Sequence, residues 1–229
     1  TMTTNGQLLD RYIDELQEIG IDGINISLDT LREDRFKDIT RVGDLNATLN
    51  AIDLSLGRGI RIKLNTLIQK GFNDDEIEEL TEFALNKGID IRFIELMPIG
   101  FADAERGQSS EETMHCIKDL YPEIYEDNSR HGNGPAVYYK VPGRDGGIGI
   151  ISAIHGKFCD RCNRIRLTSK GYIKPCLCYE DGVFIRPYLE KSDAEIKRAF
   201  TEIIKFKPAC HNFENVQAVD HNSMSQIGG

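Results

Sequence analysis

The sequence predicts an α/β protein in which a parallel sheet forms part of a barrel and is followed by an α+β region with a metal site. Helix and strand signals alternate over the first hundred residues, the pattern changes after Gly100, and four of six cysteines lie within twenty positions. Strand–helix–strand units of about 30 residues favour parallel strands with right-handed crossovers. A complete eightfold barrel takes about 250 residues, so we expect the 229-residue chain to hold only part of one.

Hydrophobic periodicity locates the elements of the first half. A 3.6-residue period predicts helices, and a two-residue period predicts strands. Asn73 is a candidate N-cap for the third helix. Residues 1–5 resemble the end of a strand, so we expect about four parallel strands, with the first part of the barrel missing before residue 1. The predicted helices are 7–19, 45–56 and 74–86, and the predicted strands between them are 22–28, 60–66 and 89–96.

After Gly100 the pattern indicates a different architecture. Residues 101–110 are polar and form a predicted connector. Two short strands around a glycine-rich turn favour an antiparallel pairing. We therefore expect two domains, 1–105 with the barrel strands and 106–229 with the α+β region. The elements predicted in the second domain are helices at 111–120 and 193–206 and strands at 137–141 and 148–152.

Composition narrows the class of protein. The net charge of −9 makes the chain a poor general nucleic-acid ligand, although a local basic patch can still bind an anion. No apolar run reaches the roughly 18 residues of a membrane helix, and the first residues lack the pattern of a secretory signal. Clustered cysteines in a chain of this length indicate a reduced, cytoplasmic protein with one metal site.

The cysteine segment is the strongest motif. Cys159 and Cys162 form a C-x2-C loop, and Cys176 follows thirteen residues later, with Gly171 at the turn of a predicted hairpin. Three thiolates suit an iron–sulfur cluster with one open iron. With Cys178 the pattern equally suits a closed four-thiolate zinc site. His155 is a further candidate ligand, and a chance grouping of structural cysteines is the remaining alternative.

The same segment is basic. Residues 155–175 carry six Lys or Arg and one Asp, a local charge of +5. Arg164 and Arg166 are two residues apart in a predicted strand, so their side chains share a face. Paired guanidinium groups beside a metal centre suit a phosphate chain. The alternative is a solvated strand face.

Polar residues gather at the predicted strand ends, where ligands of parallel α/β sheets bind. Charged residues also alternate with apolar ones along 60–65, which predicts a polar cavity because an unpaired charge facing into a barrel is costly. For each residue a turn or cap role is the alternative, and Gly228 and Gly229 are either a frayed end or a tail that enters a site. The strand-end residues are Thr3, Thr4, Asn5, Gly6, Ser27, Asp29, Lys63, Asn65, Thr66, Glu95 and Met97.

These residues, in this order, resemble the GTP 3′,8-cyclases, the radical S-adenosylmethionine enzymes of molybdenum cofactor biosynthesis. The resemblance covers nearly the whole chain, and its C-terminal cysteine–arginine segment is specific. It rests on Thr3-Thr-Asn-Gly-x-Leu-Leu9, Ile24-Asn-Ile-Ser-Leu-Asp29, Lys63 before Ile68-Gln-Lys-Gly71, Arg92-Phe-Ile-Glu95 with Met97, Phe158-Cys-x-x-Cys-Asn-Arg-x-Arg-Leu-Thr168, Cys176-Leu177 and the terminal Gly-Gly.

The resemblance implies an incomplete (β/α)6 TIM-like barrel and a C-terminal region with a second [4Fe–4S] cluster. It favours iron over zinc, and it implies an open iron for the guanine of GTP, a homodimer, and transfer of the product to cyclic pyranopterin monophosphate synthase. Cys178 is then an extra thiol. The implied residues are Cys159, Cys162 and Cys176 for the cluster; Thr3, Lys63, Arg164 and Arg166 for GTP; Ser27 and Met97 for S-adenosylmethionine; and Gly228 and Gly229 for a catalytic tail.

One departure limits the expected activity. The family binds its radical-generating cluster through a C-x3-C-x2-C motif, which this sequence does not contain. We therefore expect an N-terminally truncated chain that binds GTP through the second cluster but does not start the radical reaction alone. The rival interpretations are a structural zinc module that binds a nucleotide, and another radical S-adenosylmethionine enzyme with an auxiliary cluster.

Overall fold

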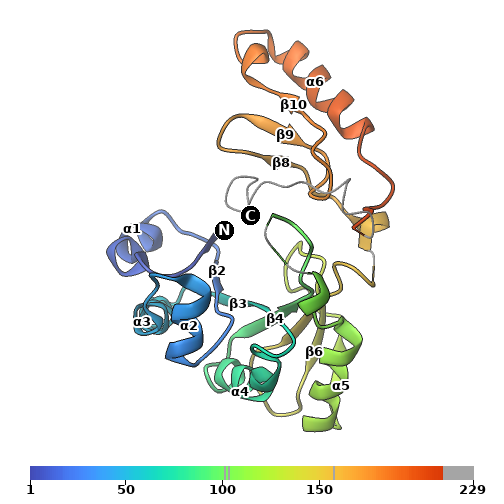
Figure 1. Ribbon diagram of the computed structural model, residues 1–229. Coiled ribbons are helices and arrows are strands. Elements are labelled where there is room, and N and C mark those ends of the chain that lie inside the picture. The colour runs from blue at the N-terminus through green and yellow to red at the C-terminus, as the bar shows by residue number, and fades with distance from the viewer. Residues whose placement is uncertain (101, 103, 157, 214–229) are drawn as a thin grey trace. The chain divides into compact units, whose positions relative to one another are not determined.

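The computed structural model describes residues 1–213 except 101, 103 and 157. The chain forms two compact units, shown in Figure 1. The first contains residues 1–96 and 106–156, and the second contains residues 97–105 and those from 157 onward. The division near residue 105 into family domains stays a prediction.

A mostly parallel sheet organises the first unit. Its order is β1-β2-β3-β4-β7-β6-β5, in which the first five strands are parallel and the last two continue the sheet antiparallel. This confirms the predicted α/β class, and closure into a partial barrel stays a prediction. The strands are β1 (Met2–Thr4), β2 (Ile24–Ser27), β3 (Ile62–Leu67), β4 (Asp90–Ile94), β5 (Tyr125–Asp127), β6 (Val137–Lys140) and β7 (Ile148–Ile151).

Local capping explains where several helices begin. The Asp44 carboxylate accepts the N–H of Asn46 at 2.8 Å at the start of α3, and Ser109 and Glu112 form a capping box at α5. The helices are α1 (Ile13–Glu18), α2 (Glu33–Thr40), α3 (Leu45–Gly57), α4 (Ile77–Asn86) and α5 (Ser110–Leu120), with short 3-10 turns η1 (Leu9–Arg11), η2 (Asp74–Glu76) and η3 (Ala104–Arg106).

Three of these helices differ from the sequence prediction. The predicted helix at 7–19 is divided into η1 and α1, and α2 was not predicted. Only Phe36 of α2 is buried, so this helix has no apolar stripe to detect. Asn73 lies at the N-terminus of η2 without capping it, because its side chain bonds instead to the backbone of Gln69, Asp29 and Leu67.

The core of the first unit lies between the sheet and the helices outside it (Figure 1). Along β3 and β4, the side chains of one face are buried, while the alternating residues on the other face are partly exposed and, apart from Leu67 and Ile94 at the strand ends, polar. Burying a Leu, Ile or Phe side chain stabilises a fold by about 1.5–3 kcal/mol, so the apolar face carries most of the packing energy. Its strand residues include Ile24, Ile26, Ile62, Leu64, Ile91, Phe93 and Ile148.

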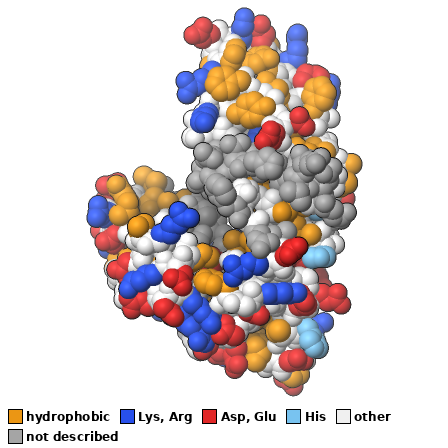
Figure 2. All heavy atoms as spheres, in the orientation of Figure 1, with side chains coloured by type: hydrophobic (Ala, Val, Ile, Leu, Met, Phe, Trp, Pro, Cys, Tyr) orange, Lys and Arg blue, Asp and Glu red, His pale blue; other side chains and the backbone are white. Residues whose placement is uncertain are grey.

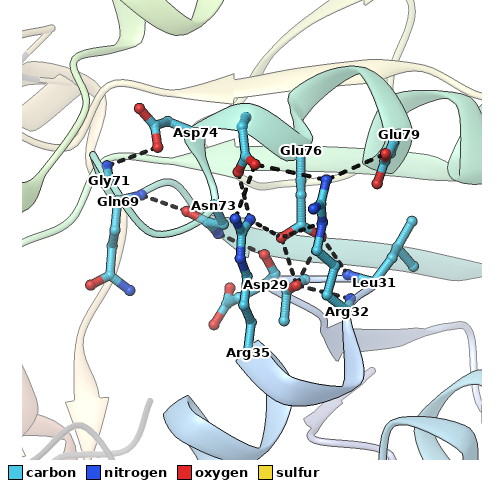
Figure 3. A network of polar contacts seen from close by, with 12 residues as sticks. Asp29, Leu31, Arg32, Arg35, Gln69, Gly71, Asn73, Asp74, Glu76 and Glu79 are labelled. Carbon is cyan, nitrogen blue, oxygen red and sulfur yellow. Dashed lines mark hydrogen bonds and ion pairs between the residues drawn. The ribbon is translucent and has the colours of Figure 1, made fainter.

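A polar network joins the carboxyl ends of β2 and β3 to the start of α4 (Figure 3). The Glu76 side chain has no solvent exposure, and its carboxylate accepts the Thr30 hydroxyl at 2.7 Å and the Leu31 N–H at 2.8 Å. Arg35 of α2 donates to the same carboxylate at 2.6 Å. Because each buried oxygen is paired, the network anchors α2 without a large apolar contact.

The second unit contains a three-stranded antiparallel sheet, β10-β9-β8, and one long helix, α6 (Asp193–Lys205). Ile173, Ile185 and Ile203 form its small core. Gly171, with φ +82°, supplies the left-handed turn that lets β9 return antiparallel to β8, as predicted. The strands are β8 (Arg166–Leu167), β9 (Tyr172–Lys174) and β10 (Val183–Phe184), with 3-10 turns η4 (Phe158–Arg161) and η5 (Arg186–Tyr188).

Two surface properties bear on the class of protein. Acidic and basic side chains are interspersed over the face seen in Figure 2. Within the part of the chain that the structure describes, every helix is too short or too polar to cross a bilayer.

Asp29 makes the stability of the first unit depend on pH. Burial raises the pKa of its carboxyl from 3.8 to about 6, against the opposing effect of the Leu67 N–H bond. The folded state thus keeps a proton that the unfolded chain releases near 3.8, so this stabilisation is full below that pH and is lost as the pH rises through about 6. Asp29→Asn keeps an oxygen acceptor for Leu67 and cannot ionise.

We therefore expect the free energy of unfolding of Asp29→Asn, relative to the wild type, to increase between about pH 4 and about pH 7. Urea denaturation at intermediate pH values measures this difference. The exposed Asp22→Asn is the control. A wild-type-to-variant difference that is independent of pH would contradict the assignment.

Candidate functional site

The polar face of the parallel sheet brings predicted residues of three strands together with polar residues of β4. The register places Thr3 beside Asn25, Asn25 beside Lys63, and Lys63 beside Asp90. One step further along the strands, Ser27 lies beside Asn65 and Asn65 beside Arg92. This arrangement confirms the predicted alternation of apolar and polar faces.

Side-chain hydrogen bonds link this face across the sheet. Arg92 donates to the Asn25 side-chain oxygen at 2.7 Å, and the Asn25 amide donates to the Thr3 hydroxyl at 3.3 Å. The side-chain oxygen of Asn65 is buried without a hydrogen-bond partner among the described residues. An unsatisfied buried acceptor in the middle of a polar face indicates a place for a ligand donor.

Lys63 uses all three ammonium hydrogens within the first unit. It donates to Asp90 at 2.7 Å, to the His131 carbonyl at 2.6 Å and to the Tyr138 hydroxyl at 3.1 Å. Its side chain is 23% exposed and that of Asp90 is 16% exposed. A ligand that takes up Lys63 must therefore replace one of these contacts.

His131 connects Lys63 to a polar cavity of about 240 Å³. Its ring nitrogens face Asp90 at 3.2 Å and Asp127 at 2.8 Å, and the ring stacks on Tyr138 at 3.9 Å. The hydrogen bond with His131, followed by that of the Ser129 N–H, holds the pKa of Asp127 well below its usual value. Asp90, Asn25 and His131 were not among the predicted site residues, because their role depends on contacts between distant parts of the chain.

Glu95, directly after β4, accepts hydrogen bonds from the start of α5 and from the loop at 154–155. Its carboxylate accepts the backbone N–H groups of Ser110 at 2.7 Å, Ile154 at 2.6 Å and His155 at 3.0 Å. Burial alone would raise the pKa of Glu95, but these donors lower it below the usual value. The His155 ring nitrogen Nδ1 also faces Glu95 at 3.2 Å, and its role as a metal ligand stays a prediction.

The predicted S-adenosylmethionine contacts lie in different units. Ser27 is exposed at the end of β2 in the first unit, whereas Met97 belongs to the second. Their joint contact with one cofactor stays a prediction. Gly228 and Gly229, predicted to form the tail, lie outside the described residues.

The cysteine segment forms a short loop and hairpin in the second unit. Cys159 lies in η4, and the Cys162 N–H donates to its carbonyl at 3.2 Å. Cys176 follows β9 by two residues. All three thiols are free and partly exposed, whereas Cys178 is fully buried and burial raises the pKa of its thiol. Cys178 thus differs from the other three in its access to an external cofactor.

Of the two predicted arginines only Arg166 lies in β8, and Arg164 precedes this strand by two residues, so the strand is shorter than predicted. Arg164 is exposed and Arg166 is partly exposed. Burial, followed by repulsion from Arg164, lowers the pKa of Arg166, while Cys162 and Cys176 both lie near enough to oppose this shift. Lys174 pairs with Arg166 in register but is only 1% exposed, so it does not contribute an open charge to the basic segment.

The donor set can be compared with the two metal alternatives. Among the described residues, no three His, Cys, Asp or Glu side chains converge closely enough to hold a single metal ion. Three partly exposed thiols in one short segment, set apart from a buried fourth, are a donor set that suits an iron–sulfur cluster with three protein ligands.

We expect Asp90→Asn to lower the free energy of unfolding by about 1–3 kcal/mol, because it leaves the half-buried Lys63 ammonium without its anionic partner. Chemical denaturation at neutral pH measures the change. Asp53→Asn is the matched control, since Asp53 is 59% exposed in its ion pair with Lys87 and should cost under about 1 kcal/mol. Equal losses in the two variants would show that Asp90 is no more important than a surface partner.

Comparison with known proteins supplies independent evidence. Residues 1–84 match the family model of the Radical SAM superfamily, and residues 89–213 match that of Molybdenum Cofactor Synthesis C. The whole chain is 42% identical to a GTP 3′,8-cyclase of Clostridium perfringens (strain SM101 / Type A), covering 72% of that protein. It is 41% identical to a GTP 3′,8-cyclase of Alkaliphilus oremlandii and 43% identical to one of Clostridium botulinum (strain Langeland), covering 71% of each. The chain therefore belongs to the GTP 3′,8-cyclase family of radical S-adenosylmethionine proteins.

Proposed function

We propose that this chain provides the GTP-binding part of a GTP 3′,8-cyclase in molybdenum cofactor biosynthesis. Support comes from the family membership and, in the structure, from the β8–β9 hairpin, where three accessible thiols and two arginines share one short segment. Cyclisation between C3′ of the ribose and C8 of the base requires the nucleotide to be held in one orientation, which simultaneous contacts to its base and its phosphates provide. The hairpin offers groups for both.

Cys159, Cys162 and Cys176 would hold the second [4Fe–4S] cluster. When bound, a cluster with only three protein ligands supplies an open iron to which the guanine can coordinate. Cys178 is fully buried and stays a neutral packing residue in this proposal.

Arg164 and Arg166 would bind the triphosphate. Guanidinium groups bind phosphate oxygens bidentately, and Arg164 is exposed on the second unit. Lys63 and Thr3, on the polar face of the first unit, would join them. When Lys63 binds a phosphate oxygen, its ammonium gives up one of its three internal hydrogen bonds. The ammonium therefore has an acceptor both before and after GTP binds.

The remaining assignments concern the barrel and its cofactor. The parallel strands of the first unit would form part of a (β/α)6 barrel, with Ser27 and Met97 contacting S-adenosylmethionine and Gly228–Gly229 reaching the reaction centre. This sequence contains no C-x3-C-x2-C motif. The proposal therefore assigns GTP binding, and not cleavage of S-adenosylmethionine, to this chain alone. Homodimerisation and transfer of the product to cyclic pyranopterin monophosphate synthase follow from the family resemblance.

GTP binding to the anaerobically reconstituted chain tests the phosphate site. We expect Arg164→Ala and Arg166→Ala each to weaken GTP binding by about tenfold or more, since a hydrogen bond to a charged group contributes about 1.5–3 kcal/mol. Equilibrium dialysis measures the affinity, and guanosine, which lacks phosphate, should be unaffected.

Arg161→Ala is the matched control, because the Arg161 side chain is 77% exposed in the same basic segment. Its affinity for GTP should remain near the wild-type value. If Arg164→Ala and Arg166→Ala bind GTP as tightly as this control, these two arginines do not form the triphosphate site.

A further inference from the structure

The stretch that follows α6 makes polar contacts with each part of the cysteine segment. The Lys207 ammonium donates to the Arg164 carbonyl at 2.7 Å and to the Pro175 carbonyl at 2.8 Å. The His211 backbone N–H donates to the Cys159 sulfur at 3.4 Å. Residues 207–211 therefore contact the segment before β8, the residue after β9 and the turn η4.

The two carbonyls bound by Lys207 lie next to cysteines. Arg164 follows Cys162 by two residues, and Pro175 directly precedes Cys176. The register of β8 and β9 pairs Arg166 with Lys174 and Leu167 with Ile173, and toward the turn the Thr168 N–H donates to the Tyr172 carbonyl at 2.9 Å. The register stops at Arg166 and Lys174 on the side of the cysteines, so the sheet itself does not fix the distance between the cysteine-bearing ends.

A shared cation can fix that distance. Two carbonyl oxygens directed at one point repel each other, and an ammonium between them converts the repulsion into two charge-assisted hydrogen bonds. Lys207 is only partly exposed, so water competes incompletely for these bonds. His211 is 8% exposed, and its ring packs on Phe213 with a centroid distance of 4.5 Å, which holds the far end of the same stretch in place.

We propose that Lys207 is a positioning residue of the iron–sulfur site, whose ammonium ties the Cys162 and Cys176 ends of the hairpin together at the spacing the cluster requires. The inference rests on the proposed function, because that proposal assigns the cluster to these cysteines. Lys207 does not touch the cluster or the nucleotide. It acts through the backbone on either side of the ligands, as outer groups of metal sites do.

Cluster retention tests this role. Lys207→Met keeps most of the aliphatic stem and removes the charge, and Lys207→Arg keeps a cation with several donors. Lys205→Met is the matched control, since Lys205 lies two residues earlier, is 65% exposed and pairs only on its own helix with Glu202. After anaerobic reconstitution, the rate at which an iron chelator bleaches the cluster is measured for each variant.

We expect Lys207→Met to lose the cluster roughly 10-fold to 100-fold faster than the wild type. Lys207→Arg should restore part of the difference, and Lys205→Met should behave as the wild type. Loss of the cluster at the wild-type rate in Lys207→Met would overturn the inference.

A metal-free measurement separates this inference from the proposed function. In a chain that retains only Cys162 and Cys176, with the other four cysteines replaced, oxidised glutathione drives formation of the disulfide between them. Lys207→Met removes both charge-assisted hydrogen bonds and should slow this step by roughly tenfold or more. An unchanged disulfide rate would refute the role of Lys207. A wild-type chain that takes up no iron or sulfide would instead refute the proposed function, while the disulfide rate still decides the role of Lys207.

Discussion

The two-residue alternation along the parallel strands is the constraint on which the rest of the structure depends. One face of each strand is buried against helices, which forces the intervening side chains onto the other face. On β3, that requirement buries Ile62 and Leu64 and places Lys63 and Asn65 together with polar residues of β2 and β4. A register shift of one residue would exchange the faces and bury the charges. The same pattern that stabilises the sheet therefore produces the polar surface proposed to bind ligands.

Three carboxylates then fix the positions of the helices, loops and side chains around that sheet. Glu76 fixes α2, Glu95 joins the end of β4 to the start of α5 and to the loop at 154–155, and Asp90 holds Lys63. Each of these carboxylates accepts hydrogen bonds from several donors. Such bonds hold loops against the sheet even where the apolar contact area between them is small. In the second unit, where the core is small, Lys207 makes comparable contacts with backbone carbonyls at both ends of the cysteine hairpin.

Sequence periodicity predicted the elements that have an apolar stripe and failed where polar contacts determine the structure. Helix α3 and the strands around Lys63 follow their patterns, whereas α2 is held by the ion pair of Arg35 and buries only Phe36. The strands at 137–141 and 148–152 form an antiparallel pair as predicted, but their membership in the main sheet depends on β7 lying parallel to β4. No local pattern encodes such a long-range pairing.

The site residues show the same division. Spacing alone left iron–sulfur and zinc open for the cysteines, and only the family resemblance favoured iron. The burial of Cys178 distinguishes it from the other thiols, a property that depends on tertiary packing. The contact of Lys63 with the His131 carbonyl joins residues 68 positions apart, so no sequence pattern could indicate it.

Metal and acid-labile sulfide content after anaerobic reconstitution tests the central claim most directly, with Cys176→Ala and Cys178→Ala compared side by side. The account predicts about four irons and four sulfides per chain, lost in Cys176→Ala and kept in Cys178→Ala. One zinc without sulfide, lost in both variants, would contradict it.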